Sequence, residues 1–82
     1  MDETERTICE AVLEIAQRRS PEIKQVSRQH SLVDDFGLSS MDYAELVATL
    51  EMLLNADPFA ESVSITTIRT VGDLCDAYKK VL

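Results

Sequence analysis

Three stretches of the chain place apolar residues at the spacing of an α-helix, and each has a recognisable boundary signal. The first stretch covers residues 4–18. Asp2 is placed to cap its start, and Glu5 follows three residues later, where its side chain can reach back to the cap. Pro21 stops the helix soon after its last apolar turn. The residues expected on its buried face are Ile8, Val12, Ile15 and Ala16.

The second stretch begins at Ser40 and ends near Leu54. Ser39 stands immediately before it and Asp42 follows three residues later, which is the spacing of a capping box. We expect its buried residues to be Leu46, Val47, Leu50, Leu53 and Leu54. A different face of the same helix carries Met41, Glu45, Ala48 and Met52.

Thr70 and Asp73 form a similar capping pair at the start of the last helix. The apolar positions of that helix are Val71, Leu74, Cys75, Tyr78 and Leu82. Residues 20–38 form a long polar connection, and its apolar anchors are Ile23, Val26, Leu32, Val33 and Phe36. Residues 58–68 are expected to be irregular or to carry one short helical turn. The sequence therefore predicts an all-α fold, a single domain over residues 1–82 built as a small bundle of three to four helices with a long loop between the first two.

Composition excludes several classes of function. The 82 residues leave room for one domain, and 45% apolar with 28% charged residues is the balance of a folded chain. A net charge of -7 argues against binding nucleic acid or an anionic membrane surface. No apolar run approaches the ~20 residues of a membrane span, and the first residues lack the pattern of a signal peptide. We therefore expect a cytoplasmic protein.

The negative charge is concentrated in the middle of the chain. Between Gln29 and Ile68 there are seven acidic residues and no lysine or arginine. These acids are Asp34, Asp35, Asp42, Glu45, Glu51, Asp57 and Glu61. Such a stretch is either a solvated face or a surface that steers basic partners. On the sequence alone, the acids have no nearby opposite charge.

The chain carries no residue set for catalysis. It has a single histidine, no GxSxG elbow and no glycine-rich phosphate loop. Cys9 and Cys75 belong to no CxxC pair and do not complete a metal site with His30. We expect the two cysteines to be buried and to pack as small hydrophobic residues. The sequence leaves open whether a disulfide joins the first and last helices. The protein is therefore not expected to be an enzyme or to bind a metal.

Residues 34–42, which read DDFGLSSMD, are the most informative segment. Gly37 allows a tight turn into the helix, and two hydroxyl groups follow at its start. The unpaired amides and the dipole at a helix N-terminus favour a phosphate esterified there. The plain alternative is that both serines only cap the helix.

This segment resembles the modification site of acyl carrier proteins, in which the serine of a Gly-x-Asp-Ser-Leu motif receives phosphopantetheine. Matching residues 36–42 to that motif places the modified serine at Ser40. Met41 stands where the family has leucine, and Ser39 stands where it has aspartate. The stretch at residues 65–74 ends in a sequence similar to the family's I-x-T-V-G-D-L entry to the last helix.

The resemblance implies an acyl carrier protein of a specialised lipid or secondary-metabolite pathway, with a bundle of the acyl-carrier type. Its cofactor would be phosphopantetheine, taken from coenzyme A and attached to Ser40, holding an acyl group as a thioester. Its partners would be a phosphopantetheinyl transferase, an acyl- or aminoacyl-loading ligase, and synthase or transferase enzymes with basic docking patches, and the carrier would be a monomer. The residues expected to contact partners are Met41, Asp42, Glu45, Ala48 and Glu51.

Two other functions stay open. A peptidyl or aminoacyl carrier, such as a D-alanyl carrier, would use the same serine. An acidic helical adaptor without a prosthetic group would use the serines only as caps.

Overall fold

The computed structural model describes residues 2–60 and 64–82. Within these residues the chain forms three α-helices and two short 3₁₀ turns, and no strand is present. The elements are α1 (Glu3–Arg19), α2 (Ser40–Leu54), η1 (Pro58–Ala60), η2 (Ile65–Thr67) and α3 (Val71–Lys79). The predicted small helical bundle is confirmed, with two short turns where one was expected. No helix in the described part of the chain is both long and apolar enough to cross a membrane.

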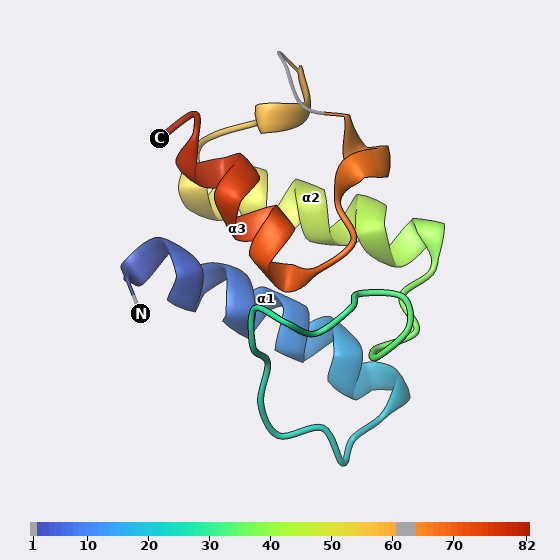
Figure 1. The fold of residues 1–82 in the computed structure, drawn as a ribbon. Coiled ribbons are helices and arrows are strands. Elements are labelled where there is room, and N and C mark those ends of the chain that lie inside the picture. The colour runs from blue at the N-terminus through green and yellow to red at the C-terminus, as the bar shows by residue number, and fades with distance from the viewer. Residues whose placement is uncertain (1, 61–63) are drawn as a thin grey trace.

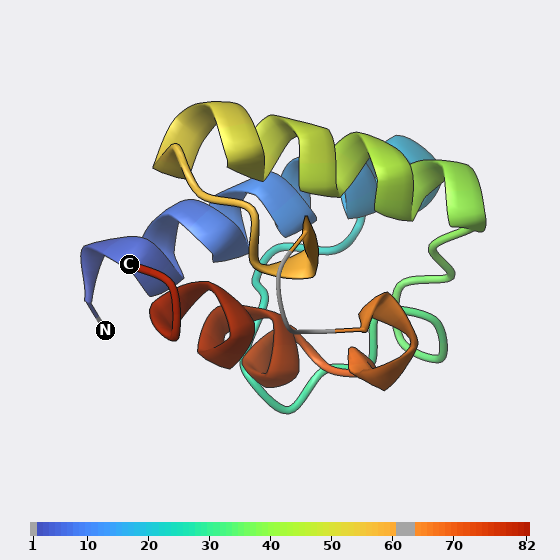
Figure 2. The same cartoon turned by 90° about the horizontal axis from the view of Figure 1, so that it is seen from above.

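The arrangement of the helices brings the end of α1 to the start of α2. The two helices run in opposite directions, and α3 packs against α1 (Figure 1; Figure 2). The connection between α1 and α2 loops away from the bundle and returns to it before α2 begins (Figure 1). The turn η2 lies near the start of α2 in both views. These positions place the two serines at one end of the molecule.

The predicted helix caps are present. The Asp2 carboxylate accepts a hydrogen bond from the Glu5 amide at 2.8 Å. Reciprocal capping boxes open the other two helices, formed by Ser39 with Asp42 and by Thr70 with Asp73. The expectation for the Glu5 side chain is wrong, because its carboxylate contacts Arg28 and Lys79 at 2.6 and 2.7 Å instead of turning back to the cap. Two nearby cations outcompete a single backbone amide for this carboxylate.

One hydrophobic core joins the three helices and the connection. Its most completely buried large side chains are Ile8, Val12, Leu32, Leu46, Leu50, Val71, Leu74 and Tyr78. The connection contributes Leu32 and Phe36, as the sequence predicts, while Ile23 and Val26 pack partly against the core. Val47 and Leu54 of α2 are only partly buried. The contact face of α2 is therefore narrower than its apolar pattern suggests.

Three residues that we expected to be buried are exposed over more than half of their surface: Val33, Leu53 and Leu82. Leu53 lies in the last turn of α2, where its neighbour Leu54 packs partly against the core instead. The last helix ends at Lys79, so the helical spacing that placed Leu82 on its buried face no longer applies there. Val33 borders a surface groove instead of the core.

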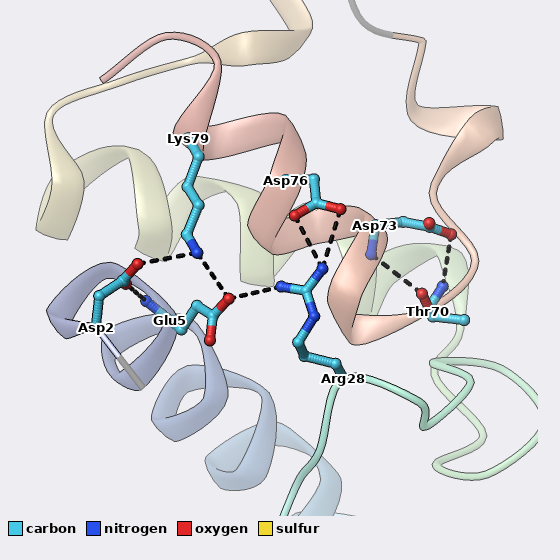
Figure 3. Close-up of polar contacts among 7 residues, drawn as sticks. All are labelled: Asp2, Glu5, Arg28, Thr70, Asp73, Asp76 and Lys79. Atoms are coloured by element: carbon cyan, nitrogen blue, oxygen red, sulfur yellow. Dashed lines mark hydrogen bonds and ion pairs between the residues drawn. The ribbon is translucent and has the colours of Figure 1, made fainter.

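Hydrogen bonds fasten the long connection to the start of α3. Three backbone bonds of 3.0 Å join Leu32 to Arg69, Val71 to His30 and Gly72 to Arg28. The Arg28 guanidinium then bridges two helices, because it lies 2.6 Å from Glu5 of α1 and 2.9 Å from Asp76 of α3 (Figure 3). Lys79 adds ion pairs to Asp2 and Glu5 in the same cluster (Figure 3). The connection is thus a fixed part of the bundle.

Candidate functional site

A tight turn delivers the two serines to the start of α2. Gly37 adopts the left-handed conformation with φ of 67°. The next residue, Leu38, is buried in the core and anchors the turn there. Ser39 is engaged in the cap, since its Oγ accepts from the Asp42 amide at 3.2 Å and its amide donates to the Asp42 carboxylate at 2.9 Å. Ser40 is the first residue of α2 and is exposed. The two hydroxyls therefore have different environments.

The acidic residues nearest Ser40 have cationic partners. Both Nε and Nη2 of Arg19 lie 3.0 Å from Oδ2 of Asp42, and Arg18 lies 2.6 Å from Glu45. The Ser39 amide, and after it the Arg19 guanidinium, hold the pKa of Asp42 below its ordinary value. Our expectation that the acids of this segment are uncompensated is wrong for these two. The compensating charges come from the last two residues of α1, outside the segment.

The other expected recognition residues lie on the exposed side of α2. Ala48 and Glu51 are exposed, and Met41 is 83% exposed, among the most exposed large apolar side chains described. Met52 is also exposed, at 80%. Glu61, which belongs to the acidic stretch, lies outside the described residues. The structure thus brings an apolar side chain next to Ser40 and a second one further along the same helix.

A groove of about 400 Å³ opens beside Ser40, between the start of α2 and η2. It is lined by Val33, Ser40, Tyr43, Ala44, Ile65, Thr66 and Ile68. The Tyr43 hydroxyl lies 3.5 Å from the Ile68 carbonyl, and partial burial raises the pKa of Tyr43. This groove was not predicted from the sequence. The only signal available was the pair of isoleucines at 65 and 68, outside any long helical pattern.

No protein-family model matches the chain, and no solved structure matches it. The fold and the site define the protein only as a small helical bundle with an exposed serine at the start of its middle helix. The serine borders a mainly apolar groove, and the nearest carboxylates are held by arginines. Such an arrangement can present a group esterified to Ser40 at the surface and can shelter an apolar chain beside it.

Proposed function

We propose that this protein is an acyl carrier protein and that Ser40 carries a phosphopantetheine arm. One observation carries the proposal: Ser40 is exposed and borders the apolar groove, while the neighbouring hydroxyl of Ser39 is used to cap α2. The first residues of a helix leave backbone amides without intrahelical acceptors, and these favour an anionic ester. This distinction between adjacent serines supports the register that the sequence resemblance implies.

The residues around Ser40 fit such a group. The carboxylate of Asp42, two residues after Ser40, accepts from the Ser39 amide and pairs with Arg19, so its charge opposes a phosphodiester less than a free carboxylate would. When bound, the arm supplies a terminal thiol on which an acyl group is held as a thioester. The chain's own residues attach and orient the group and limit its contact with water.

The groove favours an acyl cargo over an amino acid. Val33, Ala44 and Ile65 give it a mainly apolar lining. Burying part of an aliphatic chain there would be favourable by ~25 cal/mol per Å² of apolar surface, whereas burying a free ammonium group would carry a desolvation cost. A specialised lipid or secondary-metabolite pathway suits such a carrier.

Partner enzymes would dock on the exposed side of α2. Met41 offers an apolar contact beside Ser40, and Glu51 is an exposed acid further along the helix. A transferase, a loading ligase and a synthase with basic patches can each use this kind of surface for brief association. Asp42 and Glu45 belong to the same surface, but a basic partner has to compete with Arg19 and Arg18 for them.

The test is modification by a broad-specificity phosphopantetheinyl transferase with coenzyme A, followed by intact mass and peptide mapping. We expect one adduct on the parent, none on Ser40→Ala, and an adduct on Ser39→Asn, which preserves a capping side chain. Circular dichroism checks that each variant is folded. An adduct that moves to Ser39 in Ser40→Ala would show that the register is wrong. A folded parent that accepts no arm would favour the adaptor function instead.

A further inference from the structure

Two free cysteines from opposite ends of the chain meet in the core. Cys9 belongs to α1 and Cys75 to α3, and both are buried without a disulfide. Both belong to the core cluster that forms where α1 packs against α3, and each thiol is close enough to shift the pKa of the other. Their exposure differs, because Cys9 retains 8% of its surface in contact with solvent and Cys75 retains none.

The exposed edge of Cys9 borders a second groove, of about 230 Å³, between α1 and the connection. This groove is lined by Arg6, Cys9, Glu10, Leu13, Lys24, Gln25 and Val26. Two of these side chains are cationic and one is acidic, so the groove has a local excess of positive charge although the protein is acidic. None of its lining residues belongs to the groove beside Ser40.

We propose that the groove beside Cys9 is a redox-modification site for small anionic disulfides, and that Cys75 resolves the adduct into a Cys9–Cys75 disulfide that links α1 to α3. The Cys9 thiolate attacks one sulfur of a disulfide R–S–S–R, forming a mixed disulfide and releasing R–S⁻, which is protonated to R–SH. The Cys75 thiolate then attacks the Cys9 sulfur and releases the second R–SH. Two protein thiols are oxidised, and one small disulfide is reduced to two thiols.

The surroundings of the pair set the rate of this exchange. Charged groups face the pair from three elements: Glu5 of α1, Arg28 of the connection and Lys79 of α3. Burial, and after it the Glu5 carboxylate, raises the pKa of Cys9, and burial raises the pKa of Cys75 to about 12. Thiolate is therefore scarce at neutral pH, so the exchange is expected to be slow there and to accelerate as the pH rises.

The experiment exposes the folded protein to glutathione disulfide and follows mass and peptide linkage. We expect the parent to lose two hydrogen atoms by joining Cys9 to Cys75. Cys75→Ser should stop at a glutathione adduct on Cys9, whereas Cys9→Ser should form no adduct, because Cys75 has no exposed surface. If the serine variants unfold, the matched alanine variants serve the same comparison.

A second comparison tests the charge of the groove. Arg6→Glu with Lys24→Glu should slow the reaction with glutathione disulfide and speed it with the cationic disulfide cystamine. The proposal is overturned if both thiols stay free in the folded parent, if Cys9→Ser and Cys75→Ser react equally, or if linkage needs denaturant. Modification of Ser40 is a separate measurement on the other groove, so failure of either proposal leaves the other standing.

Discussion

The guanidinium group of Arg19, at the end of α1, lies 3.0 Å from the Oδ2 atom of Asp42 in the first turn of α2. The same oxygen accepts a hydrogen bond from the Ser39 amide at 2.9 Å. One carboxylate therefore caps α2 and also ties the end of α1 to the segment that carries Ser40. Arg18 pairs with Glu45 one turn further along. The surface around Ser40 is less negative than the local sequence suggests.

Removing these two arginines should expose the acids to partners. We expect Arg18→Ala with Arg19→Ala to raise the rate at which a basic transferase modifies Ser40 at low salt by about two- to fivefold, through faster association. Steady-state rates at two salt concentrations measure the effect, which should shrink as salt rises. Arg6→Ala is the matched control, because it removes a cation from α1 that borders the other groove. An unchanged or slower rate in the double variant would contradict this role.

The two capping aspartates should determine part of the acid sensitivity of the fold. Backbone amides, those of Arg69 and Thr70, hold the pKa of Asp73 below its ordinary value of 3.8, and the Ser39 amide lowers that of Asp42 in the same way. Because the pKa is lower in the folded state, each carboxylate stabilises the fold above about pH 3.8. That stabilisation is lost as the pH falls through the folded-state pKa.

Melting curves recorded from neutral to acidic pH measure this dependence. Asp73→Asn should melt at a lower temperature than the parent near neutrality, and the difference should narrow in acid. Asp34→Asn is the control, because Asp34 is an exposed acid outside the helix caps. If the melting temperature of Asp73→Asn stays below that of the parent by the same amount at every pH, the lost stability is not electrostatic.

The caps could be predicted from sequence because their partners are three residues apart. Ser39 with Asp42 and Thr70 with Asp73 form wherever a helix begins at that point, whatever the helix packs against. The Arg19–Asp42 contact joins residues 23 apart, and it depends on how α1 packs against α2. A single sequence contains no signal for that geometry.

The groove beside Ser40 was unpredictable for the same reason. Val33 comes from the connection and Ile65 from η2, and they border one groove only because both segments lie near the start of α2. The apolar pattern of the sequence placed Val33 in the core, since hydrophobicity alone does not separate a core residue from a groove residue. The position of Ser40 at the start of α2 was predictable, because the capping signal before it is local in the sequence.

The close approach of the connection to α3 should depend on Gly72. A Cβ atom there would lie 3.2 Å from the Arg28 carbonyl oxygen and 3.3 Å from the Arg28 Cβ. That carbonyl is fixed by the 3.0 Å bond from the Gly72 amide, so it cannot move without weakening the bond. We expect Gly72→Ala to lower the free energy of unfolding by about 1 kcal/mol, despite the better helix propensity of alanine. Urea denaturation measures the change, and a more stable variant would show that the connection can shift.

The buried hydroxyl of Tyr78 should cost stability. It has no hydrogen-bond partner among residues 2–60 and 64–82, and burial raises the pKa of Tyr78 to about 12. Its ring makes an edge contact with Phe59 at a centroid distance of 6.1 Å, which phenylalanine would keep. We expect Tyr78→Phe to raise the free energy of unfolding by about 1 kcal/mol and Tyr78→Ala to lower it by about 3 kcal/mol. A destabilised phenylalanine variant would indicate that the hydroxyl has a partner.

Charge and apolar contact on α2 should affect docking differently. Asp42→Lys and Glu45→Lys should each slow the modification of Ser40 at low salt, and the loss should shrink as salt rises. Each change also leaves an arginine of α1 beside a new lysine, so the local charge reverses. Met41→Ala should weaken docking at every salt concentration, because the 83% exposed side chain contributes apolar burial in the complex.

Comparison of the two acids separates recognition from folding. Asp42 caps α2, so Asp42→Lys should also lower the free energy of unfolding. Glu45 is exposed and outside the cap, so Glu45→Lys should slow modification with a smaller effect on folding. Met52→Ala is the control for Met41, since Met52 is almost as exposed but lies in the second half of the helix. If Glu45→Lys is modified as fast as the parent at low salt, this acid is only part of a solvated face.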